Sequence, residues 1–380
     1  MKAQIAKLPL SLRITRHRKK RFRSFPPDPA LARILLVGQS SRILEVIMQF
    51  KSFARTTVAL ALFSVSLTAC DSTRPTRQAV KEVTIAQYGD LLIYLPLYIA
   101  EDQKFFEQEG VRPRFISGGG DDKTFAALAA GSAQFGVSDP TFTAIAREKG
   151  SKAVVVGTVV AGATYWGVTW NKNIAYAKTP AGLKDLRVAT YEAPSTNYAL
   201  MAKSFKEYRA QVGRARIVQG SYGNLISMVK AGQADVAMEL EPAASTAVKE
   251  GAHIVYSYPE IYGPFMLTGL YVMESYRDKD PKTVQGVVNA LERAMRFAHS
   301  NPAAAVAIAR RKFPDVDPQV VDAAVRRMIS SKTLPPHVTM DRAGWANTVN
   351  VRVELGDLKD RASASRTLDD TFATRAVAVR

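Results

Sequence analysis

Residues 83–108, VTIAQYGDLLIYLPLYIAEDQKFFEQ, place a short β-rich run directly before a helical stretch. The first part, VTIAQY (83–88), predicts a strand, and LPLYIAEDQKFFEQ (95–108) predicts a helix. Pro96 lies in the first turn of that helix, where its missing N–H removes no hydrogen bond. Repetition of this pair would build right-handed βαβ units and a mostly parallel sheet covered by helices on both faces.

The same alternation continues through two segments of similar size, separated by YWGVTWNKN (165–173). Beyond FMLTGLYVM (265–273) the sequence is almost wholly helical, and residues such as Val284, Val288 and Leu291 keep the spacing of one buried helix face. We therefore predict an α/β protein with two α/β units and a helical C-terminal part. The further predicted strands are RPRFIS (112–117), AQFGVSD (133–139), AVVVGTVV (153–160), LRVATY (186–191), ARIVQG (215–220), DVAMEL (235–240) and HIVYSY (253–258).

The positive charge of the chain is concentrated near its beginning. The 380 residues are 47% hydrophobic and 23% charged, which is typical of a folded protein, and the net charge is +18. Thirteen basic and two acidic residues stand before Cys70, so only +7 remains for the rest of the chain. The body is thus mildly basic, and we predict no nucleic-acid partner.

Cys70 is the only cysteine of the chain, which excludes an intramolecular disulfide, a CxxC redox pair and a cysteine zinc site. It ends the stretch MQFKSFARTTVALALFSVSLTAC (48–70), which has two basic residues, an apolar run and a small-residue end, as a signal peptide has. Leu67-Thr68-Ala69-Cys70 resembles the bacterial lipobox, in which the cysteine is lipidated. The alternative is a short buried helix in which Cys70 is a small apolar residue.

We interpret residues 48–70 as a lipoprotein signal peptide and residues 71–82 as a linker. Asp71 resembles the signal that retains lipoproteins on the inner membrane in some Gram-negative bacteria. Residues 1–47 contain the basic run RITRHRKKRFR (13–23) and are interpreted as a gene-model extension or a basic leader. A basic nucleic-acid arm or a disordered tail would also explain these charges, but not the secretion signal after them.

Five phrases in order carry a resemblance to a known family. They are PLYIAEDQKFFEQEGV, GGGDDKTFAALAAGSAQFGVSDP, LKDLRVATYEAPSTNYAL, AGQADVAMELEP and GLYVMESYRDKDPKTVQGVVNALERA. Together they resemble the nitrate/sulfonate/taurine class of periplasmic substrate-binding proteins of ABC transporters, whose relatives also bind thiamine-precursor pyrimidines. The resemblance covers about residues 83–355.

The resemblance implies a two-lobed fold, similar to type II periplasmic binding proteins, with the ligand cleft between the lobes. Residues 83–169 and 268–355 would form lobe 1 and residues 170–267 lobe 2, with crossings near 168–171 and 264–269. Residues 356–380 are predicted to be a C-terminal tail, whose last twenty or so residues we expect to be weakly ordered because chain termini commonly are. Hinge closure would capture a small organic ligand for an ABC transporter permease. We expect a monomer without cofactor or metal, anchored to the inner membrane on its periplasmic side through Cys70.

The candidate site follows from the position of the strand ends. Ligands on open α/β sheets bind beyond the carboxyl ends of strands, where helix N-termini offer free N–H groups. At single positions the alternatives are ordinary, since glycines can serve a tight turn and Ser195 or Thr196 a helix N-cap. The predicted ligand-binding residues are Tyr88, Tyr94, Gly119, Gly120, Ser138, Asp139, Trp166, Ser195, Thr196, Asn197, Glu239 and Glu241.

The charges near these strand ends bear on the ligand class. Glu192, Glu239 and Glu241 lie near them, and no arginine or lysine occupies the strand-end motifs. This pattern does not suit a sulfonate or nitrate unless helix dipoles alone hold it, and it favours a neutral or cationic heteroaromatic ligand. Solvent exposure of the carboxylates would remove that argument.

Catalytic motifs are absent from the sequence. The four histidines are scattered without HExxH, no GxSxG occurs, and GGGDDKT has Asp122 where a Walker loop needs glycine. Pyrimidine-synthesising relatives of this fold need a cysteine-rich motif that a chain with one cysteine lacks. We predict no enzyme activity, and keep an extracytoplasmic ligand sensor and, less favoured, such an enzyme as alternatives.

Overall fold

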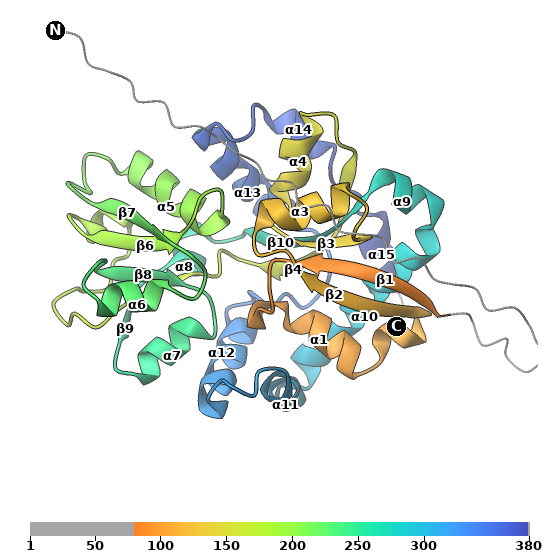
Figure 1. Ribbon diagram of the computed structural model, residues 1–380, viewed down its shortest axis with the longest axis horizontal. Coiled ribbons are helices and arrows are strands. Elements are labelled where there is room, and N and C mark those ends of the chain that lie inside the picture. The colour runs from red at the N-terminus through yellow and green to blue at the C-terminus, as the bar shows by residue number, and fades with distance from the viewer. Residues whose placement is uncertain (1–79, 379–380) are drawn as a thin grey trace, which may run out of the picture. The chain divides into compact units, whose positions relative to one another are not determined.

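The computed structural model describes residues 80–378, which form two mixed β-sheets surrounded by helices (Figure 1). The first sheet has the strand order β2-β1-β3-β10-β4 and the second has the order β7-β6-β8-β5-β9. The first sheet comprises β1 (Lys81–Gln87), β2 (Val111–Ser117), β3 (Phe135–Ser138), β4 (Ala153–Ala161) and β10 (Met266–Met273). The second comprises β5 (Trp166–Thr169), β6 (Arg187–Tyr191), β7 (Arg216–Gly220), β8 (Val236–Glu239) and β9 (His253–Ser257).

The prediction of mostly parallel sheets is wrong. β1 runs parallel to β2 and β3, and β6 runs parallel to β7 and β8, as the βαβ pattern predicts. However, β10 is antiparallel to β3 and β4, and β5 is antiparallel to β8 and β9. Each of these two strands follows directly after a crossing between the sheets. β5 follows the crossing out of the first sheet and β10 follows the crossing back into it, and both run antiparallel to their neighbours.

The two sheets define two lobes, and the chain crosses between them twice. The second crossing lies at residues 263–265 and overlaps the predicted range 264–269, but β10 begins at Met266, so the boundary predicted at residue 267 is two residues too late. The first crossing lies at residues 162–165, because Trp166 in β5 already pairs with Glu239 and Ser257 of the second sheet. β5 therefore belongs to lobe 2, and the boundary predicted at residue 169 is a few residues too late.

The helices cover both sheets, and in Figure 1 α5, α6 and α7 surround the second sheet. The long helix α10 buries the predicted face, including Val284, Val288 and Leu291, and Asp280 caps it by accepting a hydrogen bond from the Thr283 N–H. The helices of lobe 1 before the first crossing and those of lobe 2 are η2 (Leu92–Tyr94), α1 (Leu95–Asp102), α2 (Phe105–Gln108), α3 (Asp121–Ala129), α4 (Thr141–Arg147), η3 (Pro180–Leu183), α5 (Thr196–Glu207), α6 (Leu225–Lys230), α7 (Ala243–Lys249) and α8 (Tyr258–Tyr262). The C-terminal helices are α9 (Glu274–Lys279), α10 (Pro281–Ser300), α11 (Pro302–Lys312), α12 (Pro318–Ser330), α13 (Arg342–Leu355), α14 (Arg361–Ser365) and α15 (Thr371–Ala378).

The prediction that the C-terminal tail is weakly ordered is also wrong. Leu368 forms a β-bridge with Val155 of β4, and α15 packs against α10 and β4 with Phe372 buried. Helices α12 and α13 of the C-terminal part also contact lobe 2, through α7 and α5. The end of the chain thus completes lobe 1 and connects it to lobe 2.

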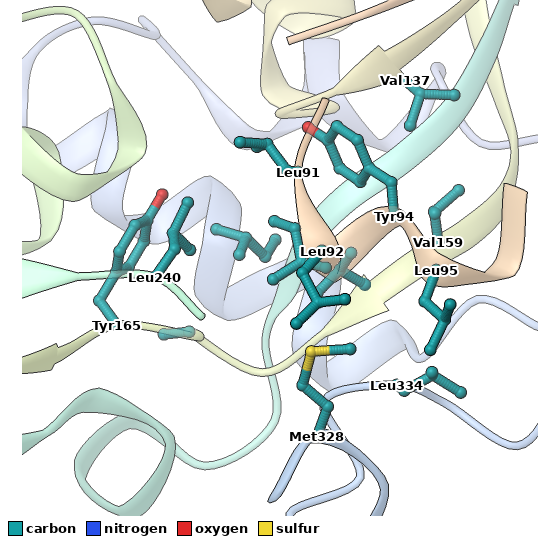
Figure 2. Close-up of a cluster of buried hydrophobic side chains, with 14 of the residues drawn as sticks. Leu91, Leu92, Tyr94, Leu95, Val137, Val159, Tyr165, Leu240, Met328 and Leu334 are labelled. Atoms are coloured by element: carbon teal, nitrogen blue, oxygen red, sulfur yellow. The ribbon is translucent and has the colours of Figure 1, made fainter. Parts of the chain in front are cut away.

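One hydrophobic cluster extends through both lobes, and Figure 2 shows part of it. Leu91, Leu92 and Tyr94 from the segment after β1 lie there near Tyr165 of the first crossing and Leu240, which follows β8. The interpreted leader, signal peptide and Cys70, and most of the linker, lie outside the described residues. Within residues 80–378, no helix combines the length and apolar character that a membrane span requires.

Candidate ligand-binding pocket

A pocket lies between the two lobes and takes walls from both. Its cavity volume is about 20 Å³, and the surrounding atom-free space of about 330 Å³ includes open solvent. A ligand of several atoms would therefore need the lobes to move apart. It lies beyond the carboxyl ends of β1 and β6, the position at which open α/β sheets bind ligands. The residues lining this interlobe pocket are Tyr88, Leu91, Ile93, Tyr94, Asp121, Tyr165, Tyr191, Ser195, Thr196, Leu240, Leu267 and Thr268.

Tyrosine rings form much of the wall and continue from one lobe to the other. The ring of Tyr222 lies 6.2 Å from that of Tyr88 in lobe 1 and 5.6 Å from that of Tyr191 in lobe 2, both edge to face. Tyr191 in turn lies 6.3 Å from Tyr165. Burial raises the pKa of the Tyr88, Tyr165 and Tyr191 phenols, so these groups stay neutral, whereas Tyr222 is 49% exposed at the rim. Such a wall suits a flat ligand that stacks on aromatic faces.

Asp139 ties the lobes together beside the pocket. Its Oδ2 accepts hydrogen bonds from Thr196 Oγ1 of lobe 2 at 2.5 Å and from Arg352 Nη2 of α13 at 2.6 Å. Arg352 Nη1 donates to the carbonyl oxygen of Pro194 in lobe 2 at 3.0 Å. Since Asp139 and Arg352 are each 1% exposed, their ion pair is shielded from solvent.

Asp121 is the acidic side chain that lines the pocket. It stands in the first turn of α3, and its Oδ1 accepts a hydrogen bond from the backbone N–H of Asp139 at 3.0 Å. Burial and the nearby charge of Asp139 raise the pKa of Asp121 to about 7. This carboxyl group therefore changes its charge near neutral pH.

Glu239 lies directly behind the tyrosine wall. Its Oε2 accepts a hydrogen bond from the Tyr191 hydroxyl at 2.6 Å, whereas its buried Oε1 has no partner among the described residues. Burial raises the pKa of Glu239 to about 7. Nearby, Asn197 Nδ2 donates to the Met238 carbonyl at 2.8 Å, while Asn197 Oδ1 is also buried without a partner.

Of the predicted site residues, Tyr88, Tyr94, Ser195 and Thr196 line the pocket. Ser195 also acts as the N-cap that the sequence allowed, because its side chain accepts a hydrogen bond from the Tyr198 N–H. Asp139, Asn197 and Glu239 lie behind these residues in the contacts described above. The structure thus brings together seven of the twelve predicted positions.

The other predicted positions lie away from the pocket wall. Ser138 is hydrogen-bonded to the Tyr271 hydroxyl at 2.7 Å within the first lobe. Glu241 pairs with Arg327 of α12 at 3.0 Å, and the Arg327 guanidinium lies 5.7 Å from the Trp166 ring. Gly119 and Gly120 form the turn before α3, where Gly119 has a φ of +78° that favours glycine.

Sequence reasoning missed two charged residues of this region. Asp121 has the sequence signal of a helix start, which gives no sign that its side chain also lines a pocket. Arg352 stands 213 positions from Asp139, and its helix gives no local sign of a partner in the pocket region. The sequence does show the aromatic residues Tyr165 and Tyr191, whose orientation toward the pocket depends on the fold.

Comparison with known proteins shows the same architecture. "Putative binding protein YtlA" of Bacillus subtilis (strain 168) is 22% identical over 294 residues, which is 74% of this chain and 85% of that protein. The periplasmic aliphatic sulphonate binding protein SsuA from Escherichia coli superposes with a TM-score of 0.61 at 15% identity, covering 76% of this chain and 92% of that one. These likenesses confirm the predicted two-lobed fold of periplasmic binding proteins.

An enzyme is also among the similar structures. The desulfurization enzyme DSZB superposes with a TM-score of 0.58 at 12% identity, covering 78% of this chain and 99% of that one. The fold therefore occurs both in binding proteins and in an enzyme. Family membership comes from the sequence itself, because the model of the family described as "NMT1/THI5 like" matches residues 93–305, more than half of the chain. The chain belongs to the NMT1/THI5-like family.

Proposed function

We propose that the protein captures a small organic ligand between its lobes, outside the cytoplasm, and delivers it to an ABC importer. The observation that carries this proposal is a pocket with walls from both lobes, which are joined by short crossings at residues 162–165 and 263–265. Rotation about two such crossings would open the pocket and close it over a ligand. A transporter permease can distinguish the closed form from the open one.

Four of the positions predicted from the sequence line the pocket, and we propose that they contact the ligand. They are Tyr88, Tyr94, Ser195 and Thr196. A thermal-shift screen of the protein purified from membranes tests the proposal, because a ligand that binds only the folded state raises the melting temperature. The panel contains small sulfonates, nitrate, thiamine-precursor pyrimidines and other heteroaromatic compounds. A dose-dependent rise supports a binding protein, and no rise across the panel counts against one.

We further propose that the mature protein is a lipoprotein of the inner membrane, anchored on its periplasmic side through Cys70. The support is the order of basic residues, apolar run and small residues before this cysteine. Intact-mass measurement of the membrane-extracted protein should show a chain that begins at a lipidated Cys70. An unmodified Cys70 within a full-length chain would contradict the anchor, and Cys70→Ser should block both lipidation and signal cleavage.

The likeness to DSZB favours an enzyme as the second candidate. The two functions differ in what happens to a bound compound. Mass spectrometry of each compound that raises the melting temperature, before and after prolonged incubation, separates them. A binding protein returns the compound unchanged, and an enzyme converts it.

A further inference from the structure

The buried acids of the described residues differ in whether a cation accompanies them. Three of them form an ion pair, and two do not. The paired acids are Asp139 with Arg352, Glu241 with Arg327 and Glu292 with Arg296, and the unpaired acids are Asp121 and Glu239. A buried acid without a cationic partner either stays protonated or takes its positive charge from outside the protein, so these two acids are open to a cationic ligand.

Both unpaired acids belong to the interlobe pocket. Asp121 lines it, and Glu239 is one hydrogen bond away through the Tyr191 hydroxyl. The partners of the two carboxylates are neutral donors, a backbone N–H for Asp121 and a phenol for Glu239. The nearby Arg352 is engaged by Asp139, Asp357 and the Pro194 carbonyl, so it supplies no free positive charge.

The pocket wall offers hydroxyl groups but no positive charge to an anion. No lysine, arginine or histidine is among its lining residues in the described part of the chain. Helix N-termini do not replace them, because the first turn of α3 already carries Asp121 and Asp122 at its positive end. At α5 the Ser195 side chain already satisfies the Tyr198 N–H. The wall does offer tyrosine faces, which attract cations.

We propose that the ligand of the interlobe pocket is a small organic cation that carries an amine or amidine on a flat ring. The cation is the missing partner of Asp121, which contacts it directly, while Glu239 acts on it through Tyr191. This inference rests on the proposed binding function and narrows its ligand class. It separates this chain from the sulphonate-binding protein of the same fold.

The titration of the two acids supports the same conclusion. Burial raises the pKa of both to about 7, so without a ligand each is partly protonated at neutral pH. A bound cation favours their ionised forms and releases protons, and its affinity should rise with pH. The groups that act on Asp121 are Asp139, Asp122, Arg352 and the phenols of Tyr88, Tyr94 and Tyr165. Those that act on Glu239 are the phenols of Tyr191 and Tyr222 and the backbone N–H of Leu240.

Three probes of nearly one shape test the charge of the ligand. Benzamidine is cationic, benzamide neutral and benzoate anionic, and each is titrated into the membrane-purified protein by calorimetry at pH 6 and pH 8. Benzamidine should bind about tenfold to a hundredfold more tightly than benzamide at pH 8, as charge-assisted hydrogen bonds imply, and by a smaller factor at pH 6. Benzoate should bind most weakly.

Variants assign the preference to these carboxylates. Asp121→Asn should abolish the preference for benzamidine, and Glu239→Gln, which can still accept the Tyr191 hydrogen bond, should reduce it. The control Asp122→Asn removes an equal, exposed charge one residue away and should keep the preference. Far-UV circular dichroism confirms that each variant is folded.

A ranking of benzoate at or above benzamidine overturns the inference, as does undetectable benzamidine binding at millimolar concentration. A preference that survives in the folded Asp121→Asn variant also overturns it. The proposed function stands if sulfonates or nitrate raise the melting temperature instead. It falls together with the inference only if no compound of the wider thermal-shift panel binds.

Discussion

Arg352 of α13 lies 2.6 Å from Asp139, measured between Nη2 and Oδ2, and also donates a hydrogen bond to a carbonyl of lobe 2. One buried guanidinium thus links helix α13, the end of β3 and the segment before α5. Because its partners belong to both lobes, the arrangement described here is a closed one. The segment after this helix, which the sequence predicts as a weakly ordered tail, packs into lobe 1 instead.

Replacing Arg352 by Met should destabilise the protein by about 3 to 5 kcal/mol, because Asp139 would remain as an uncompensated buried charge. Urea unfolding followed by circular dichroism measures the change. Arg342→Met in the same helix is the matched control, since its ion pair with Asp370 is exposed and should contribute at most about 1 kcal/mol. Equal losses in the two variants would show that the buried pair has no special role.

Thr196→Val should favour the open form, because it removes the hydrogen bond from lobe 2 to Asp139 and leaves the contacts within each lobe intact. A hydrogen bond to a charged group contributes about 1.5 to 3 kcal/mol. Small-angle scattering should show a larger radius of gyration for the ligand-free variant. Thr246→Val, whose hydroxyl donates only to the Pro242 carbonyl within lobe 2, should leave the radius unchanged. The same radius for both variants would refute this role of Thr196.

Stability should fall as pH rises from 5 to 8 in the ligand-free protein. Glu239 has a folded pKa of about 7 against an ordinary value of 4.5, so between these values the folded state holds a proton that the unfolded state has lost. Stability is therefore present at low pH and is lost as pH approaches 7, by ~3 kcal/mol for this group. Urea unfolding of Glu239→Gln at both pH values should show a smaller decrease than the unmodified protein shows. Parallel pH profiles would contradict the raised pKa.

Phe372→Ala should cost about 3 to 5 kcal/mol, because the ring is 4% exposed in the core beneath α15. Thr374→Ala, on the exposed side of the same helix, should change stability by no more than about 0.5 kcal/mol. Urea unfolding compares them. If Phe372→Ala were as stable as Thr374→Ala, the C-terminal helix would contribute nothing to lobe 1.

The parts of the fold that local patterns determine could be predicted from the sequence. Short β-rich runs predict strands β1, β6 and β8, and helical spacing predicts the apolar face of α10. Their place at strand ends identifies Tyr88 and Ser195 as pocket residues. The residue at which the chain first passes from lobe 1 to lobe 2 could not be predicted, because β5 is short and its pairing with β8 and β9 depends on segments far along the chain. A terminal position likewise gives no local sign that Phe372 will be buried.

The charged part of the site required the fold. Asp121 and Asp122 have the same sequence signal at a helix start, yet one lines the pocket and the other is exposed. Arg352 lies far along the chain from every residue it contacts in the pocket region, so only the packing of α13 identifies it. Of the three acids that the sequence places near strand ends, Glu239 is buried behind the pocket wall, Glu241 is paired with Arg327, and Glu192 is exposed to solvent, so only Glu239 keeps its weight in the argument about ligand charge.

The most direct test of ligand capture is the distance between the lobes with and without ligand. Spin labels at Ala126→Cys in α3 and Ser227→Cys in α6, in a Cys70→Ser background, report this distance by pulsed electron resonance. The compound that raises the melting temperature most is added at saturation. The account predicts that a broad distribution narrows to one short distance on binding. An unchanged distribution at saturation would contradict closure over the ligand.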